Sequence, residues 1–253
     1  MPKPVTLTKA GGVGHLQLNR PEAANTINMP FAEALGEAVD RIAQDDAVKA
    51  VLLTGNGKRF CAGGDISAFA ESSDQGGFLS KLAATIDGGV QALESLQKPV
   101  VAAVHGAVAG GGLGIMLAAD VIIAAEGTSF VFAYPSIGLT PDCGTSASLS
   151  RTMGLHRALA FALSGRPLDA GQALNQGLVT EVVVDPLARA GEVASAWASG
   201  ASGASGALGD VRRMLRQAPG LSRAEVGERE ASTIGRRMAT DEAQVLIQSF
   251  LGR

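Results

Sequence analysis

The chain is poor in cysteine, in aromatic residues and in charged residues. Its 253 residues include two cysteines, Cys61 and Cys143. Two cysteines provide neither a disulfide framework nor a metal-binding motif, and low cysteine use is typical of a reducing compartment. The N-terminal residues MPKPVTLTKAGG contain no apolar segment of the kind that secretory signals carry. We therefore expect a cytoplasmic protein without a bound metal.

Basic charge is scarce as well. The net charge is −3 at pH 7, which argues against a broad basic surface for nucleic acid or anionic lipid. One uncharged stretch, residues 99–119, has about the length of a membrane span. It contains five glycines between Gly106 and Gly114, each of which costs a helix roughly 1 kcal/mol, and Asp120 ends it. We expect neither nucleic acid nor a membrane as a partner.

Glycine is abundant, and its most informative use lies in the middle of the chain. Residues 100–104 form an apolar, partly β-branched run that predicts a buried strand. Gly106 and the triplet 110–112 interrupt this run, and an apolar helix is expected from Leu113. A glycine turn at the start of a helix exposes backbone N–H groups that can bind an anion or stabilise a developing oxyanion. A turn that only permits close packing is the alternative interpretation.

The remaining pattern predicts alternating strands and helices, followed by helices alone. Alternating apolar residues at 5–9 and 13–19 predict a hairpin. Asn28 is a candidate helix N-cap, and Asp169 with Gln172 and Ser222 with Glu225 are candidate capping boxes. Further strands are expected at residues 48–54, 121–124, 130–133 and 179–184, and further helices at 79–96, 151–163, 207–217 and from Thr240. This order favours an α/β core with a C-terminal helical subdomain.

Several motifs, in their order and spacing, carry a family resemblance. They are Leu18-Asn19-Arg20-Pro21-Glu22 with Asn25, Phe60-x-Ala62-Gly63-x-Asp65-Ile66, Lys98-Pro99 before the glycine triplet, Gly138-Leu139-x-Pro141-Asp142, and Leu174-x-x-x-Gly177-Leu178-Val179. Together they resemble the crotonase superfamily, the enoyl-CoA hydratases and isomerases, over nearly the whole chain. The resemblance implies a spiral α/β core of repeated ββα units over residues 1–190 and a helical trimerisation region over residues 191–253. It also implies a homotrimer or hexamer.

The same resemblance implies an acyl-CoA substrate, with coenzyme A as part of the thioester and no separate cofactor. In the family, two backbone N–H groups bind the thioester oxygen, and the matching positions here are Gly64 and Gly111. Each donor of this kind contributes roughly 3 kcal/mol to stabilising an enolate. The residues that would hold the adenosine and pantetheine portions are Ala24, Ala62, Gly63, Asp65 and Ile66.

The chain departs from the family pattern at the positions that decide the reaction. Family hydratases carry two glutamates that position and deprotonate water. The first matching position here is Gly114, and the second is Tyr134, or Ser136 if the match is made through Pro135. None of these residues is acidic, so a hydratase with two carboxylates is disfavoured.

Asp142 is the remaining candidate acid. Family isomerases use an acidic residue at this position to move protons, and the family's 4-chlorobenzoyl-CoA dehalogenase uses an aspartate there as a nucleophile. A turn or a helix cap after Pro141 is the alternative interpretation. Tyr134 would line the acyl pocket or donate a hydrogen bond, and a tyrosine that only packs is the alternative interpretation. Asp87, at the place of the dehalogenase's assisting histidine, is either an accessory group or a solvated helix residue.

We therefore expect an enoyl-CoA isomerase that uses Asp142 as acid and base. The alternatives are an enoyl-CoA hydratase, an acyl- or aryl-CoA hydrolase or dehalogenase with Asp142 as nucleophile, and a non-catalytic protein that binds CoA esters.

Overall fold

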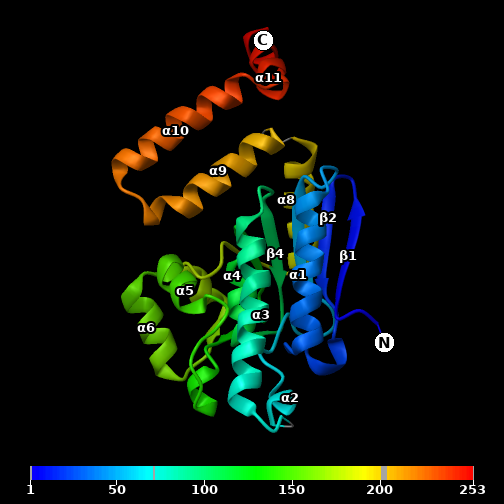
Figure 1. Ribbon diagram of the computed structural model, residues 1–253, viewed down its shortest axis with the longest axis vertical. Helices are drawn as coiled ribbons and strands as arrows, with labels where there is room; N and C mark the ends of the chain where they lie inside the picture. Colours follow the sequence, from blue (N-terminus) through cyan, green and yellow to red (C-terminus); the bar gives the residue numbers. More distant parts are fainter. Residues whose placement is uncertain (1, 71, 201–203, 253) are drawn as a thin grey trace.

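The computed structural model describes residues 2–70, 72–200 and 204–252, and within them the strands form two sheets (Figure 1). The larger sheet has the order β1 (Val5–Ala10), β2 (Val13–Leu18), β3 (Ala50–Gly55), β4 (Val100–Val104), β6 (Val121–Ala125) and β9 (Glu181–Val183). The smaller one has the order β5 (Ala107–Ala109), β7 (Ser129–Val131) and β8 (Leu168–Asp169). The predicted hairpin of β1 and β2 is confirmed, and β2, β3, β4, β6 and β9 run parallel to one another.

Helices begin where the sequence provides caps. Asn28 accepts a hydrogen bond from the Phe31 N–H at the start of α1, and the two predicted capping boxes begin α7 and α10. The α-helices are α1 (Met29–Gln44), α2 (Ile66–Ala70), α3 (Gln75–Ser95), α4 (Gly111–Leu117), α5 (Thr145–Met153), α6 (Leu155–Ser164), α7 (Ala170–Asn175), α8 (Pro186–Ser199), α9 (Ser205–Gln217), α10 (Arg223–Met238) and α11 (Asp241–Leu251). Three 3-10 turns are η1 (Pro21–Ala23), η2 (Tyr134–Ile137) and η3 (Ala218–Gly220).

The alternation of side chains along β3 and β4 builds a core on each face of the larger sheet. Val51, Leu53 and Val100 point into the main core, together with apolar residues of α1 and α3. Leu52 and Val101 point to the other face, where α8 covers them. Because each of these side chains is almost completely buried, each stabilises the fold by roughly 1.5–3 kcal/mol. The predicted α/β core with helices at the C-terminus is confirmed.

One predicted helix is wrong as a single element. Residues 151–163 belong to two helices, because Gly154 adopts a φ of 77° between α5 and α6. Only glycine adopts this backbone conformation at little cost, so the chain turns there. The short strand β5 was not expected either, and it lies between the predicted strand and the glycine triplet.

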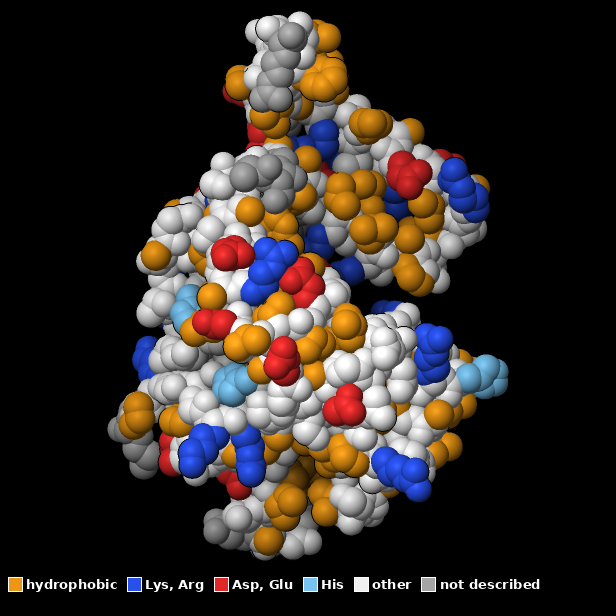
Figure 2. Space-filling model, turned by 180° about the vertical axis from the view of Figure 1, so that it is seen from behind, with side chains coloured by type: hydrophobic (Ala, Val, Ile, Leu, Met, Phe, Trp, Pro, Cys, Tyr) orange, Lys and Arg blue, Asp and Glu red, His pale blue; other side chains and the backbone are white. Residues whose placement is uncertain are grey.

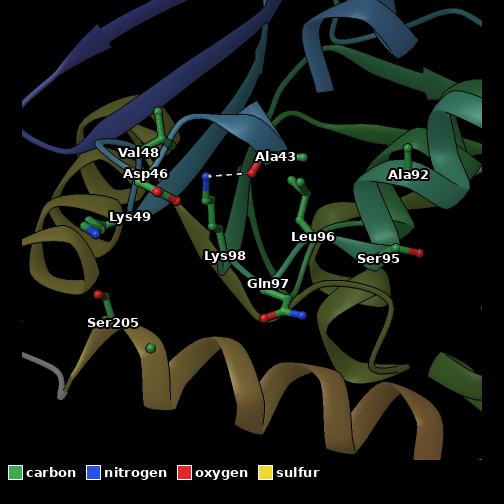
Figure 3. Close-up of a pocket in the computed structure, with 11 residues that line it drawn as sticks. Ala43, Asp46, Val48, Lys49, Ala92, Ser95, Leu96, Gln97, Lys98 and Ser205 are labelled. Carbon is green, nitrogen blue, oxygen red and sulfur yellow. Dashed lines mark hydrogen bonds between the residues drawn. The ribbon is translucent and has the colours of Figure 1, made fainter. Parts of the chain in front are cut away.

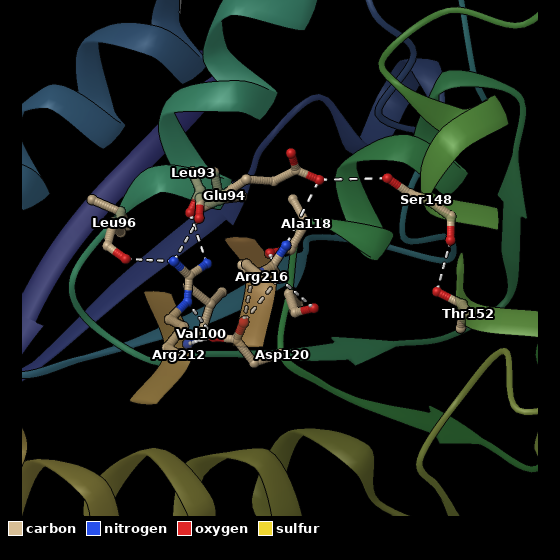
Figure 4. Close-up of polar contacts among 11 residues, drawn as sticks. Leu93, Glu94, Leu96, Val100, Ala118, Asp120, Ser148, Thr152, Arg212 and Arg216 are labelled. Carbon is tan, nitrogen blue, oxygen red and sulfur yellow. Dashed lines mark hydrogen bonds and ion pairs between the residues drawn. The ribbon is translucent and has the colours of Figure 1, made fainter. Parts of the chain in front are cut away.

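The end of the central apolar stretch anchors the C-terminal helices (Figure 4). The Asp120 carboxylate accepts hydrogen bonds from Arg212 Nε at 2.6 Å and from Arg216 Nε at 2.9 Å, both on α9. Arg212 is buried, and it also donates to the carbonyl oxygens of Leu93 and Glu94 at the end of α3. A cation at a helix C-terminus satisfies carbonyl groups that the helix leaves unpaired. Asp120 and Arg212 therefore join α9 to the sheet and to α3.

A second cation performs a similar task at the end of α1. Lys98, from the motif before β4, donates from Nζ to the carbonyl oxygens of Ile42, Ala43 and Asp45 (Figure 3). Its side chain lies in a hollow of about 580 Å³ that also contacts Asp46 and Lys49. Because this ammonium group is engaged by backbone oxygens, we assign Lys98 a structural role.

Helices α10 and α11 extend away from the core (Figure 1) and keep much of their apolar surface exposed. Figure 2 shows hydrophobic side chains gathered in this upper part of the molecule. The large apolar residues exposed on α9, α10 and α11 are Val211, Leu215, Ile234, Met238, Val245, Leu246, Ile247, Phe250 and Leu251. No helix within the described ranges is both long enough and apolar enough to cross a membrane.

Candidate active site

Two glycine turns lie side by side at the carboxyl ends of their strands. Cys61 pairs with Val108 in a parallel bridge, and the Ala109 N–H donates to the Cys61 carbonyl at 3.0 Å. Two residues further along each segment the turns touch, since a Cβ atom on Gly110 would lie 3.5 Å from Gly63 Cα. Gly64 and Gly111, the two residues predicted to bind a thioester oxygen, each directly follow one of these touching glycines.

The backbone geometry leaves an N–H group free at each of these glycines. Gly64 bridges to Ile27, but the hydrogen bonds of this bridge join the Ile27 N–H to the Gly63 carbonyl and the Asp65 N–H to the Ile27 carbonyl. Gly111 is the first residue of α4, so its N–H has no acceptor inside the helix. Among the described residues, neither the Gly64 N–H nor the Gly111 N–H has a hydrogen-bond acceptor. Both are available as donors.

The close approach of the two turns requires glycine. Gly63 and Gly110 have φ values of 97° and 50°, in the region that other residues rarely adopt. A Cβ atom added at Gly63 would lie 3.0 Å from the Ala109 carbonyl oxygen, and one added at Gly111 would lie 2.8 Å from Ile27 Cδ1. Larger side chains here would push the turns apart and separate the two donors.

The loop predicted to hold the adenosine portion is tied to the Gly64 turn. Ala24 and Asn25 both have positive φ values, and the Ala24 carbonyl accepts from the Ala62 N–H at 3.1 Å. Asn25 is fully buried, and its amide donates to the carbonyl oxygens of Asn56, Arg59 and Phe60. The structure therefore places Ala24 beside Ala62. Asn25 is an organising residue to which the sequence motif alone assigned no role.

Asp65 and Ile66 differ from each other in their surroundings. The Asp65 carboxylate pairs with Arg20 at 3.0 Å, which fixes the segment after Gly64 to the loop around Ala24. Ile66 begins α2 and is 57% exposed, so its side chain is free to meet a ligand. Phe69 of α2 covers Gly64, since a Cβ atom there would lie 2.5 Å from Phe69 Cζ. The contact of Phe69 with the candidate donor was not found from the sequence.

Asp142 does not cap a helix. The residue before α5 is Gly144, and no side chain caps that helix. The Asp142 carboxylate instead accepts a hydrogen bond from the Tyr134 hydroxyl at 2.7 Å. It also lies against Gly111, because a Cβ atom on that glycine would be 3.4 Å from Asp142 Oδ1. The structure thus places a carboxylate beside one of the two candidate donors. The helix-cap interpretation is wrong, whereas the alternative of a turn is present, since the Thr145 N–H donates to the Asp142 carbonyl at 3.0 Å.

The backbone after Asp142 is unusual. Cys143 has a φ of 53° and Gly144 a φ of 65°. A left-handed conformation at a residue with a side chain costs on the order of 1–3 kcal/mol, and such residues cluster at functional sites. This turn directs the chain into α5 and packs the Cys143 side chain against α4.

Gly114 is closed off by that turn. A Cβ atom at Gly114 would lie 2.5 Å from Cys143 Cβ and 2.9 Å from Thr145 Oγ1. No side chain of any size fits here without moving α5. The position that holds the first glutamate of family hydratases is therefore both without a carboxylate and filled by neighbouring atoms.

Asp87 lies on α3, on the other side of the same turn. It is half-buried, and its carboxylate accepts from Gln91 Nε2 at 2.6 Å. A Cβ atom on Gly144 would be 3.9 Å from Asp87 Oδ1, so Asp87 faces the turn that carries Asp142. Asp87 is thus near the candidate site, but no hydrogen bond among the described residues joins it to Asp142.

The groups around Asp142 are neutral hydrogen-bond donors. Burial, followed by the charge of Asp142, raises the pKa values of the Tyr134 phenol and the Cys143 thiol well above their usual values. Burial raises the pKa of the Cys61 thiol to about 12. Both thiols are therefore protonated at neutral pH, and since both are buried we assign them a packing role. The described ranges contain no group of three or more His, Cys, Asp or Glu side chains that could hold a metal ion.

The comparisons with known proteins agree with this geometry. The family model for enoyl-CoA hydratase/isomerase matches residues 8–251. The trans-2-decenoyl-acyl-carrier-protein isomerase of Streptococcus mutans is 40% identical over 173 residues, which cover 68% of this chain and 66% of that protein. The 1,2-epoxyphenylacetyl-CoA isomerase of Escherichia coli is 39% identical over 178 residues, which cover 69% of this chain and 67% of that protein.

The fold is similar over a longer range than these two sequence matches, which span about two thirds of each relative's length. The crystal structure of an enoyl-CoA hydratase from Polaromonas matches with a TM-score of 0.92 at 27% sequence identity. That match covers 98% of this chain and 96% of the other. Relatives and neighbours thus carry the names of both isomerases and hydratases.

Proposed function

The chain belongs to the enoyl-CoA hydratase/isomerase family, and on this premise we propose that it moves a double bond within an unsaturated acyl-CoA thioester, with Asp142 as acid and base. The observation that carries the proposal is the Asp142 carboxylate, which lies against Gly111 and has no ion-pair partner among the described residues. An ionised carboxylate without a cation on it is a suitable base.

The proposed mechanism uses the backbone donors and one carboxylate. The Gly64 and Gly111 N–H groups bind the thioester oxygen. Asp142 removes a proton from one carbon of the acyl chain, and the electron pair of that C–H bond moves into a dienolate whose charge rests on the thioester oxygen. The protonated Asp142 then returns the proton two carbons away. Water is neither consumed nor released, so a single acid and base is sufficient.

The closed Gly114 position favours isomerisation over hydration. A hydratase of this family needs carboxylates that hold and deprotonate a water molecule, and Cys143 and Thr145 occupy the space beside Gly114. The second matching position is Tyr134, whose phenol is a donor to Asp142. A phenol with a raised pKa does not take a proton from water at neutral pH.

One observation keeps nucleophilic catalysis as a second candidate function. Asp87 faces the turn that carries Asp142, and a second carboxylate could activate water to hydrolyse an ester formed at Asp142. A single-turnover reaction in oxygen-18 water separates the two functions. The nucleophilic route puts the label into the Asp142 carboxylate, whereas the proton-shuttle route leaves it unlabelled.

Deuterium exchange tests the proposal itself. In deuterium oxide, the enzyme should introduce deuterium at the α or γ carbon of enoyl-CoA substrates, detected by mass spectrometry. Absence of exchange with every acyl-CoA that binds would contradict the isomerase and would favour a non-catalytic binding protein. Calorimetry with the same compounds establishes binding first, so an inert protein and an untested substrate are distinguished.

The assembly that fits the exposed tail is a homotrimer or a pair of trimers. Helices α9, α10 and α11 expose apolar side chains that isolated soluble proteins usually cover. Light scattering at micromolar concentration should give three or six times the mass of one chain. A mass of one chain would contradict the proposed assembly, and with it the trimerisation role of residues 191–253.

A further inference from the structure

The Tyr134 hydroxyl has two possible hydrogen-bond acceptors but one proton. It lies 2.7 Å from Asp142 Oδ1 and 3.4 Å from Thr145 Oγ1. The shorter distance, and the negative charge on Asp142, assign the proton to the carboxylate. Thr145 then stands beside the phenol oxygen from the first turn of α5. Tyr134 thus joins the turn η2 to the candidate acid.

The phenol is held in this orientation from several sides. Tyr134 is 7% exposed, and the Phe132 ring packs edge-on against it, with ring centroids 5.2 Å apart. The Tyr134 carbonyl accepts from the Leu139 N–H at 3.0 Å, and Gly138 ends the turn with a φ of 72°. A ring that is packed and bonded in this way has little freedom to turn its hydroxyl elsewhere.

The Tyr134 hydrogen bond ends on Asp142 Oδ1, which is also the oxygen 3.4 Å from the position of a Cβ atom on Gly111. The phenol therefore holds the carboxylate oxygen that lies beside this candidate donor. The hydrogen bond also fixes the plane of the carboxylate, because the Asp142 side chain would otherwise rotate about its terminal bond.

We propose that Tyr134 is a positioning residue, whose phenol fixes the orientation of the Asp142 carboxylate beside Gly111 so that this carboxylate can carry the proton between the two carbons of the substrate. This inference rests on the proposed function, since Tyr134 acts through the proposed base. It goes beyond the expected roles of Tyr134, because it names the group to which the hydroxyl donates, whereas a wall of the acyl pocket needs the aromatic ring alone.

Tyr134→Phe separates these two roles because it keeps the ring and removes the hydroxyl. If the hydroxyl positions Asp142, kcat should fall about 10- to 100-fold while KM stays within about twofold. The acidic limb of the pH–rate profile should also move upward by about one pH unit, because the ionised carboxylate loses a donor. The titratable groups around Asp142 are Tyr134 on η2, Cys143 in the same turn, Cys61 in the Gly64 turn and Asp87 on α3, and none of them is a cation.

Two further variants make the result specific. Ser146→Ala removes an exposed hydroxyl from α5 and should leave kcat, KM and the pH profile unchanged. The double variant Tyr134→Phe, Asp142→Asn should be no slower than Asp142→Asn alone, because Tyr134 acts through Asp142. An unchanged kcat and pH profile in Tyr134→Phe, or a further loss in the double variant, would overturn the inference. Full activity of Asp142→Asn would instead overturn the proposed function.

A measurement on the unaltered tyrosine covers the case in which Tyr134→Phe does not fold. Tyr134 is the only tyrosine of the chain, so the tyrosine doublet of the ultraviolet resonance Raman spectrum reports this residue alone. The relative intensity of the doublet depends on whether the phenol donates a hydrogen bond, so it should differ at neutral pH between the unaltered protein and Asp142→Ala, which removes the acceptor. Identical spectra would contradict the hydrogen bond on which the inference stands.

Discussion

Two half-buried carboxylates, Asp120 and Asp142, lie at the two ends of the segment between α4 and α5, and their surroundings are opposite. Asp120 is bound by Arg212 and Arg216 and by the Val100 N–H. Asp142 is bound by the neutral phenol of Tyr134. A carboxylate held by two cations has its charge neutralised and is a poor proton acceptor, whereas one held by a neutral donor keeps its negative charge. The difference in partners therefore distinguishes an anchor from a candidate base.

The largest expected effect is a loss of unfolding free energy when the ion pair of Asp120 is removed. Asp120→Asn keeps the shape of the side chain but leaves the buried Arg212 without its counter-charge. Breaking a buried ion pair in this way costs about 3–5 kcal/mol. Chemical denaturation should show a loss of this size. The matched control is Glu192→Gln, which removes an exposed partner of Arg189 and should change the free energy of unfolding by less than about 1 kcal/mol.

Asp142→Asn should have the opposite effect, a large loss of activity with little loss of stability. It removes the proposed base without removing a counter-ion, so isomerisation should fall by at least about 100-fold, or about 2.7 kcal/mol in activation free energy. Acyl-CoA affinity, measured by calorimetry, should remain nearly unchanged because the glycine donors are intact. If Asp142→Asn lost several kcal/mol of stability while its folded fraction kept full activity, Asp142 would be an anchor like Asp120 and the comparison would fail.

The sequence predicted the elements whose signals are local. Asn28, Asp169 and Ser222 begin helices because each bonds to N–H groups three residues away, and such pairs can be read from spacing. Gly154 was missed because one glycine inside a helical pattern is usually tolerated, and nothing nearby shows that its φ is positive. The strand β5 is too short for its periodicity to be recognised.

The sequence indicated the candidate residues of the site, whereas it did not indicate the residues that surround them. Motif resemblance selected Gly64, Gly111 and Asp142 as candidates, and the pairing of Cys61 with Val108 then explains why the two glycine turns lie side by side. The partners of these residues were not predictable. The contact of Tyr134 with Asp142, the closure of Gly114 by Cys143 and the capture of Asp120 by Arg212 depend on packing between elements that are distant along the chain or separated by turns.

Gly114→Ala tests whether the packing behind the turn that carries Asp142 matters for activity. The added methyl group would lie 2.5 Å from Cys143 Cβ, so the turn that carries Asp142 must shift. Overpacking of this kind costs about 1–3 kcal/mol of stability, and we expect isomerisation to fall more than binding because the base moves. The control is Gly127→Ala, at a glycine with open space around it. Equal stability and activity in both variants would show that Gly114 is not closed.

The smallest expected effect concerns the neutral groups around Asp142. Burial raises the pKa of Cys61 from 9.0 to about 12, and the charge of Asp142 contributes to this rise in the same direction. A group whose pKa is higher in the folded state stabilises the fold fully below its unfolded pKa, and this contribution is lost as the pH rises through the folded value. Between pH 8 and pH 10.5, the free energy of unfolding should therefore fall by about 1–2 kcal/mol for each buried thiol.

Cys61→Ala removes one of the two thiols, so this variant should lose about 1–2 kcal/mol less stability than the unaltered protein over the same interval. Asp120→Asn should lose as much as the unaltered protein, because Asp120 does not act on these thiols. Denaturant titrations of the three proteins at both pH values make this measurement. An alkaline loss in Cys61→Ala equal to that of the unaltered protein would mean that the fold does not raise the pKa of Cys61.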